Sequence, residues 1–171
     1  MTATEVMTRA EDAIDGGYAA AGDAFARGQL VVISDDRECS LAVSASDATT
    51  HSVAEMIRFG SGLIFVALGR ERLDQLDIPR MPMDSPGRAG TFHVAVDSAS
   101  GISTGISAVD RCHTMRALAD PGSVRGDFVR PGHLIPVAGD VVPARSPGIA
   151  ELALALAAET HPALPVRRSA P

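Results

Sequence analysis

Short apolar runs alternate with helical segments along this chain, and this alternation limits its fold more than any other feature. Residues 30–33 and 63–68 are rich in β-branched and aliphatic side chains and are short enough to be buried strands. Residues 50–58 follow a Thr that suits a helix N-cap, and residues 70–76 form a predicted helix that ends before Pro79. A chain of 171 residues suits one domain with a single core. The order of the segments predicts an α+β fold, built as a mixed α/β sandwich.

The rest of the chain continues the same pattern. Three more strands are predicted, over residues 41–45, 91–97 and 134–137. Two more helices are predicted, one from Ser107 or Asp110 to about Leu118 and one over residues 147–159. We expect a single domain over residues 1–160, followed by a flexible tail over residues 161–171 that contains three prolines.

Charge and composition exclude several classes of partner. A net charge of −6 with scattered Arg residues argues against nucleic-acid binding, which needs clustered basic side chains. The apolar runs are far shorter than the roughly 20 residues of a membrane span, and the first residues lack a secretion signal. We therefore expect a cytoplasmic protein. All 15 basic residues are Arg, so catalysis by a Lys is excluded, and an anionic substrate would be bound by Arg, hydroxyl groups or backbone amides.

An acidic segment joins the first two predicted strands. It reads Asp35-Asp36-Arg37-Glu38 and is followed directly by Cys39-Ser40-Leu41. The only other cysteine is Cys112, and the two lack the spacing of a metal site, so we expect free thiols.

A series of short motifs follows this segment in a fixed order. They are Gly62-Leu63-Ile64, Val66-Ala67-Leu68, Glu71-Arg72-Leu73, Pro79-Arg80-Met81, Thr104-Gly105-Ile106-Ser107-Ala108-Val109-Asp110-Arg111, Thr114 and Arg130-Pro131-Gly132-His133. Together they resemble the 3,4-dihydroxy-2-butanone 4-phosphate synthase family, whose members convert ribulose 5-phosphate to a four-carbon phosphate and formate. The resemblance runs from Gly28 to about Ala158. It implies the fold of that family and a homodimer with active sites at the subunit interface.

The chain departs from the family pattern where the catalytic residues of the family lie. The acidic loop of the family reads Asp-Asp-Glu-Asp-Arg-Glu-Asn-Glu-Gly-Asp-Leu, so two positions and the later Glu and Asp are missing here. The resemblance implies two metal ligands, a Glu that Glu38 matches and a His whose position Pro147 occupies. Because proline offers no donor atom, we expect no metal and no cofactor, with magnesium needed only if synthase activity persists.

The same resemblance singles out the candidate site residues. Those expected to act in catalysis are His133, Glu38 and His93. Those expected to bind substrate are Arg37, Thr104, Ser107, Asp110, Arg111, Arg130, Arg145 and Phe65. Structural alternatives stay open: His133 suits an acid or base but also a hydrogen-bonded core residue, and Asp110 suits a helix cap.

Three functional hypotheses remain at this point. The leading one is a repurposed enzyme that carries out metal-independent cyclisation, isomerisation or elimination on a small-molecule intermediate of specialised metabolism, because Phe65, Pro147 and Ile149 make the pocket less polar. The second is a non-catalytic homologue or partner subunit of a synthase. The third is a residual synthase that still releases formate from ribulose 5-phosphate.

Overall fold

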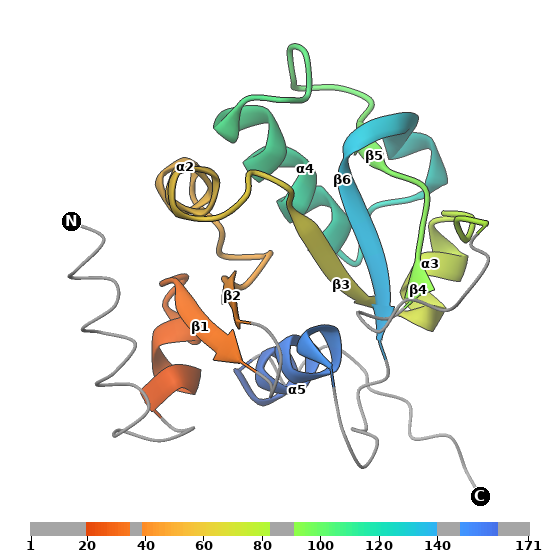
Figure 1. The fold of residues 1–171 in the computed structure, drawn as a ribbon. Coiled ribbons are helices and arrows are strands. Elements are labelled where there is room, and N and C mark those ends of the chain that lie inside the picture. The colour runs from red at the N-terminus through yellow and green to blue at the C-terminus, as the bar shows by residue number, and fades with distance from the viewer. Residues whose placement is uncertain (1–19, 35–38, 83–90, 140–147, 161–171) are drawn as a thin grey trace, which may run out of the picture.

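The computed structural model describes residues 20–34, 39–82, 91–139 and 148–160 (Figure 1). At its centre is a four-stranded sheet in which the long strand β6 (Phe128–Gly139) pairs with each of the other three. β3 (Phe65–Gly69) runs parallel to β6. β4 (Thr91–Phe92) and β5 (Val96–Ser98) run antiparallel to it.

Helices lie on both sides of this sheet (Figure 1). One side carries α2 (Thr50–Phe59), α3 (Arg70–Gln75) and α4 (Ala108–Ala119). The other side carries α5 (Ile149–Thr160), which also packs on the antiparallel hairpin of β1 (Val31–Ser34) and β2 (Cys39–Ala42). A helix over residues 20–26 precedes the hairpin, and the single turn η1 (Arg125–Asp127) leads into β6. Within the described ranges, no helix has the length and apolar character that crossing a membrane requires.

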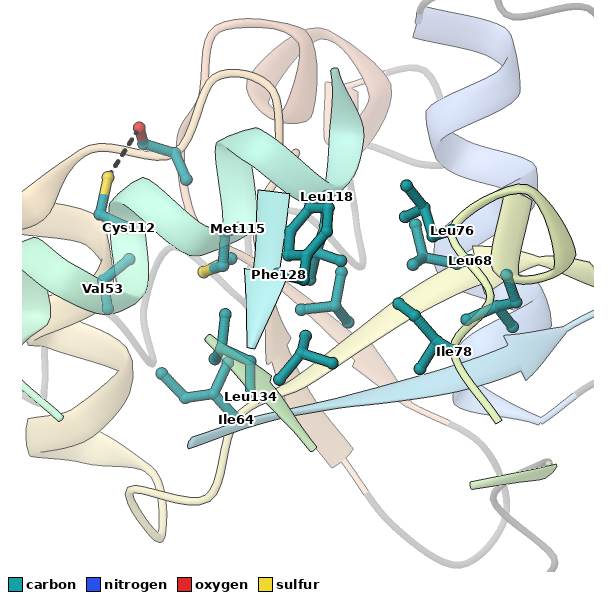
Figure 2. Packing of buried hydrophobic residues seen from close by; sticks show 14 of the residues in the cluster. Val53, Ile64, Leu68, Leu76, Ile78, Cys112, Met115, Leu118, Phe128 and Leu134 are labelled. Atoms are coloured by element: carbon teal, nitrogen blue, oxygen red, sulfur yellow. Dashed lines mark hydrogen bonds between the residues drawn. The ribbon is translucent and has the colours of Figure 1, made fainter. Parts of the chain in front are cut away.

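The main core lies between the sheet and the three helices α2, α3 and α4 (Figure 2). Val66 and Leu68 alternate along β3 with residues that face the other way, so they point into this core. Leu134 of β6 and Leu118 of α4 are fully buried beside them. A second, smaller cluster between the hairpin and α5 consists of Phe25, Val31, Ile33 and Leu156. Burial of aliphatic side chains on both sides therefore holds the sheet in place.

Capping side chains explain where α2 and α4 start. The Thr49 hydroxyl accepts a hydrogen bond from the Ser52 N–H at 3.1 Å, and the Ser52 hydroxyl accepts one from the Thr49 N–H at 2.9 Å. The Ser107 hydroxyl accepts from the Asp110 N–H at 3.1 Å. Both helix starts are confirmed as the sequence predicts them, since each cap is a local signal.

The predicted strands over 30–33 and 63–68 and the predicted helices over 70–76 and 147–159 are confirmed, with small shifts at their ends. The predicted strand over residues 91–97 is instead divided into β4 and β5. Between them the chain turns toward the end of α3, where the Val94 N–H donates to the Pro79 carbonyl at 2.9 Å and His93 forms a bridge with Arg80. The proposed tail and most of the N-terminal segment lie outside the described residues.

Two other strand boundaries also differ from the prediction. β6 begins at Phe128 rather than at residue 134, because Phe128 pairs with Ser98 of β5. β2 covers Cys39–Ala42 rather than residues 41–45, because Cys39 pairs with Ser34 across the hairpin. In both cases pairing with a distant strand decides the boundary, and local composition does not show it.

Candidate functional site

A bulge in β6 builds the main polar arrangement of the described sheet. β5 and β6 pair on both sides of residues 130–133, which are left out of register opposite Val96 and Asp97. Gly132 lies so close to β5 that a Cβ there would overlap the Val96 backbone, so only glycine fits. The bulge brings His133 against Asp97.

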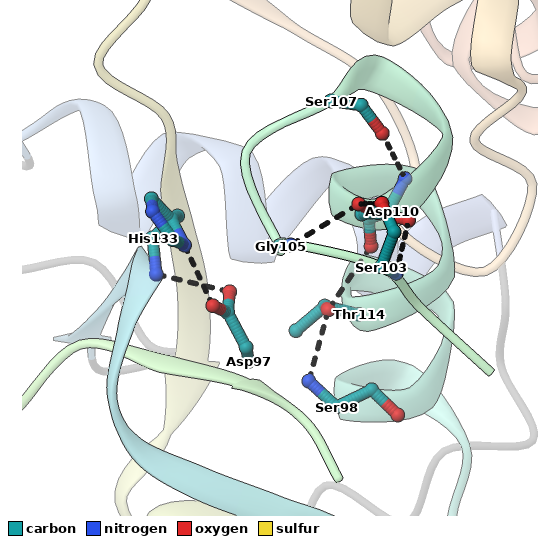
Figure 3. A network of polar contacts seen from close by, with 8 residues as sticks. All are labelled: Asp97, Ser98, Ser103, Gly105, Ser107, Asp110, Thr114 and His133. Carbon is teal, nitrogen blue, oxygen red and sulfur yellow. Dashed lines mark hydrogen bonds and ion pairs between the residues drawn. The ribbon is translucent and has the colours of Figure 1, made fainter. Parts of the chain in front are cut away.

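His133 and Asp97 form a doubly bonded pair (Figure 3). The Asp97 Oδ1 accepts a hydrogen bond from the backbone N–H of His133 at 2.9 Å, and its Oδ2 lies 2.6 Å from the ring Nδ1. The Asp97 side chain is 8% exposed, whereas the His133 side chain is 37% exposed. The carboxylate is therefore buried while the imidazole reaches the surface, an arrangement that can move a proton to or from a bound molecule.

The loop before α4 covers this pair (Figure 3). The Asp110 carboxylate accepts hydrogen bonds from the Ser103 hydroxyl at 2.7 Å and from the N–H groups of Ser103 and Gly105, each at 3.1 Å. Gly105 has a φ of +84°, and a Cβ there would overlap the Asp97 Oδ2 and lie 2.7 Å from the His133 Nδ1. Asp110 thus holds a glycine backbone directly on the pair.

A buried hydroxyl ties β5 to α4 next to the pair. The Thr114 hydroxyl accepts a hydrogen bond from the Ser98 N–H at 3.0 Å and donates one to the Asp110 carbonyl at 3.1 Å. Thr114 is fully buried. The residue after Asp97 is therefore fastened to the helix that forms the main core.

Hydrogen bonding makes Asp110 strongly acidic. The Ser103 hydroxyl, followed by the Ser103 amide, lowers the pKa of Asp110 from its ordinary 3.8 to about 2. Because the folded-state pKa lies below the unfolded one, this stability is present above about pH 4 and is lost as the pH falls toward about 2. We expect Asp110→Asn to be less stable than the parent at pH 6, with the difference shrinking between about pH 4 and 2.

Urea unfolding followed by circular dichroism at several pH values measures this difference. Asp74→Asn, on the exposed surface of α3, is the matched control and should follow the parent protein at every pH. A stability gap between Asp110→Asn and the parent that stays constant from pH 6 to pH 2.5 contradicts the assignment.

The structure brings together four of the predicted site residues, namely His133, Thr104, Ser107 and Asp110. Ser107 caps α4 by accepting a hydrogen bond from the Asp110 N–H, and the Asp110 carboxylate accepts one from the Gly105 N–H. Both residues therefore hold the loop that covers His133. Thr104 lies in the same loop and is exposed. Ser107 and Asp110 therefore have clear structural roles, and any contact with substrate stays a prediction.

Two of the four predicted Arg ligands, Arg111 and Arg130, lie among the described residues, and both bind backbone carbonyls. Arg111 donates from Nη1 to the Gly62 carbonyl at 2.6 Å and fastens the start of α4 to the segment before β3. Arg130 donates from Nη2 to the Leu76 carbonyl at 2.7 Å and fastens the bulge to the end of α3. Both guanidinium groups thus connect elements of the fold, and their binding of an anion is untested.

His93 and Phe65 each contact residues other than the His133–Asp97 pair. His93 is buried, and its Nδ1 lies 2.7 Å from the Ile78 carbonyl, so its ring has a hydrogen-bonding partner within the fold. Phe65 is half-exposed, and its ring lies against that of Phe92 with the centroids 5.6 Å apart. Neither side chain takes part in the two hydrogen bonds that join His133 to Asp97.

The remaining predicted residues, Arg37, Glu38 and Arg145, lie outside the described residues. Among the residues that the structure does describe, no three His, Cys, Asp or Glu side chains come together as a metal site would require. Cys39 is exposed and Cys112 is buried, and both are free thiols as expected.

Sequence reasoning missed Asp97 and the role of Gly105. Asp97 is an acidic residue at the end of an otherwise apolar segment, and this is the one signal that could have identified it. Its partner lies 36 residues further along the chain, so the pair depends on the β5–β6 register.

Curated relatives of the chain are named for riboflavin synthesis. It is 41% identical over 137 residues to 3,4-dihydroxy-2-butanone 4-phosphate synthase of Chromobacterium violaceum, covering 77% of this chain and 63% of that protein. It is 43% identical over 137 residues to riboflavin biosynthesis protein RibBA of Salinispora arenicola, covering 75% of this chain and 32% of that protein. The chain thus spans less than two thirds of the former and about a third of the latter.

Solved structures show the same fold. The chain matches 3,4-dihydroxy-2-butanone 4-phosphate synthase in complex with two magnesium ions with a TM-score of 0.77 at 34% identity, covering 83% of this chain and 68% of that one. It matches the synthase of Candida albicans with a TM-score of 0.74 at 32% identity, covering 83% and 72%. The predicted mixed α+β fold of this family is confirmed.

These relatives correct the leading functional hypothesis. A repurposed enzyme for cyclisation, isomerisation or elimination in specialised metabolism is wrong as the main interpretation, because the relatives at 41% and 43% identity carry synthase and riboflavin biosynthesis names.

The extent of the likeness settles the family. The sequence profile of 3,4-dihydroxy-2-butanone 4-phosphate synthase matches residues 19–164, which include the hairpin, the whole sheet and the bulge that carries His133. The chain belongs to the 3,4-dihydroxy-2-butanone 4-phosphate synthase family.

Proposed function

We propose that this chain is itself a synthase, which converts ribulose 5-phosphate to 3,4-dihydroxy-2-butanone 4-phosphate and formate. The observation that supports this most directly is the His133–Asp97 pair, in which a partly exposed imidazole is bonded to a buried carboxylate. The chain that carries this pair belongs to the synthase family. The names of the curated relatives support the same substrate class. Because the chain covers only part of those relatives, the activity is a proposal for this protein.

The reaction needs proton transfer at carbon, which suits an imidazole. One five-carbon sugar phosphate yields a four-carbon phosphate and formate, so the atoms balance without an oxidant or a second substrate. The first step is removal of a proton from the carbon beside the ketone, and a His whose side chain is 37% exposed can accept it. Later steps need a proton returned to carbon in the rearranged product, so one residue can serve in both directions.

The residues present do not reproduce the metal site that the family resemblance implies. Glu38 lies outside the described residues, and Pro147 occupies the position of the second ligand without offering a donor atom. The described residues contain no cluster that could replace them. We therefore assign no step to a metal and keep magnesium as a variable of the assay.

Formate release from ribulose 5-phosphate tests the proposal. The purified chain is assayed with magnesium and separately with a chelator, beside an active relative. We expect formate within a few tens-fold of the rate of the relative in the presence of magnesium. No formate under either condition, from protein shown to be folded by circular dichroism, overturns the proposed function and leaves the family assignment intact.

We propose that the partner of this chain is a second copy of itself. We also propose that the protein acts in the cytoplasm. Leu63, Ile106 and Val109 are 55%, 55% and 58% exposed, and the bond from Arg111 to the Gly62 carbonyl holds their two segments side by side. Exposed aliphatic side chains grouped in this way favour burial against another protein surface. We expect light scattering of the purified protein to give the mass of two chains, and the mass of one chain at tens of micromolar contradicts the dimer.

A further inference from the structure

We infer that Arg130 is a positioning residue, which fastens the start of the β6 bulge to the end of α3 and so fixes where His133 lies. The family resemblance predicts that Arg130 binds substrate, whereas in the structure its guanidinium donates to a backbone carbonyl. The effect of Arg130 on catalysis rests on the proposed function. Its effect on the bulge does not, and the two effects are tested separately.

The bulge needs support of its own, because residues 130–133 are left out of register with β5. Such residues lose conformational freedom on folding without gaining the regular bonds of a sheet. The backbone holds the second half of the bulge, since the Gly132 N–H donates to the Ala95 carbonyl at 2.9 Å. The first half contains Pro131, which has no N–H to donate. A side-chain contact therefore matters most in the first half.

Arg130 makes that contact. Its Nη2 donates to the Leu76 carbonyl at 2.7 Å, and its Nη1 lies 3.4 Å from the Phe128 carbonyl of its own strand. Hydrogen bonds from a charged guanidinium are stronger than those between neutral groups. The Arg130 Nε is buried and has no acceptor among the described residues. All three nitrogens thus face the fold, and the guanidinium joins the bulge to the end of α3.

The carbonyl that Arg130 contacts belongs to a well-fixed turn. α3 ends in a Schellman motif, in which the Ile78 N–H donates to the Leu73 carbonyl at 3.0 Å and Asp77 has a φ of +47°. The side chains of Leu73, Leu76 and Ile78 are all buried in the main core. This turn cannot shift without disturbing that core, so it gives Arg130 a fixed point of attachment.

The consequence for His133 follows from its place on the same segment, three residues after Arg130. Without the guanidinium, the first half of the bulge gains freedom, and the imidazole is displaced relative to a bound molecule. A displacement of about 1 Å at a reacting group can lower a rate about 100-fold, although the group itself is unchanged. We therefore expect Arg130 to affect kcat and not KM.

Amide hydrogen exchange in Arg130→Met tests the hold on the bulge without an activity assay. The Gly132 amide reports on the bulge, and the Ile135 amide, bonded to the carbonyl of the buried Ile64 at 3.3 Å, reports on the sheet. We expect the substitution to speed exchange at Gly132 by about 10-fold or more relative to Ile135. An unchanged ratio of the two rates overturns the inference.

Steady-state kinetics of the same variant, at a temperature where circular dichroism shows it folded, tests the effect on catalysis. We expect kcat for formate release to fall about 10- to 100-fold, with KM changed by less than about threefold. Arg130→Lys keeps a donor that can reach the Leu76 carbonyl, so it should recover part of the lost kcat. A KM raised about 10-fold or more with kcat unchanged would make Arg130 a substrate ligand and overturn the inference.

Arg72→Met is the matched control, because Arg72 also donates to carbonyls at the end of a helix. Its Nε donates to the Leu118 carbonyl of α4 at 3.3 Å, and its Nη1 donates to the Ser123 carbonyl at 3.2 Å. We expect Arg72→Met to lower stability without changing the exchange ratio or kcat. A fall in kcat equal to that in Arg130→Met would show a merely structural effect and overturn the inference. If the parent protein makes no formate, the proposed function fails, while the exchange ratios still decide whether Arg130 holds the bulge.

Discussion

Replacing His133 with alanine lowers kcat/KM for formate release from ribulose 5-phosphate by about 100- to 10,000-fold, the range that a general acid or base contributes. The variant removes the imidazole, which is 37% exposed while it is paired with the buried Asp97 carboxylate. Initial rates over a range of substrate concentrations measure the effect. His113→Ala is the control, since His113 is exposed on α4 and makes no hydrogen bond to the pair.

A second substitution separates catalysis from folding at the same position. Alanine leaves the Asp97 carboxylate buried without its ring partner, which by itself lowers stability. In His133→Asn the amide nitrogen takes a place close to that of Nδ1 and can still donate to Asp97, but nothing replaces Nε2. We expect it to be more stable than His133→Ala in thermal unfolding and as inactive. An asparagine variant that keeps activity within about threefold of the parent contradicts the role of His133 as acid or base.

Replacing Leu134 with alanine lowers the free energy of unfolding by about 2–5 kcal/mol. Leu134 is fully buried in the middle of β6, in the main core between the sheet and the helices α2, α3 and α4 (Figure 2). Removing its side chain gives up the burial of the lost carbon atoms and leaves a cavity that a sheet residue cannot close. Urea unfolding followed by circular dichroism measures the loss.

Val129→Ala is the matched control for Leu134, because it lies on the same strand and is 48% exposed. We expect it to cost less than about 1 kcal/mol. Equal losses for the two variants would show that β6 is stabilised by its strand propensity and not by the core.

The elements that the sequence predicts well are those with local signals. The starts of α2 and α4 follow from Thr49 and Ser107, whose side chains bond to amides only three residues away. The short apolar run over residues 63–68 predicts the buried strand β3, because its length and composition are themselves a local signal. The ordered motifs identify the family, and the family in turn predicts the whole fold.

The site could be predicted only in part, because its geometry depends on contacts between distant segments. His133 was identified from its motif, whereas Asp97 depends on a shift in register between β5 and β6. His93 lies on the predicted strand, yet the break between β4 and β5 turns its ring toward Ile78. Alternation along one strand cannot reveal such a break, since the cause is pairing with residues 78–80.

The hydrogen bonds of Thr114 have a consequence for how the protein opens. This fully buried hydroxyl joins the Ser98 amide to α4, one residue from the carboxylate that holds His133. We therefore expect the Ser98 amide to exchange its hydrogen with solvent slowly, at a rate close to that of amides in the main core. The bond thus couples the strand that carries Asp97 to the main core, and we expect the pair to stay in place until that core opens.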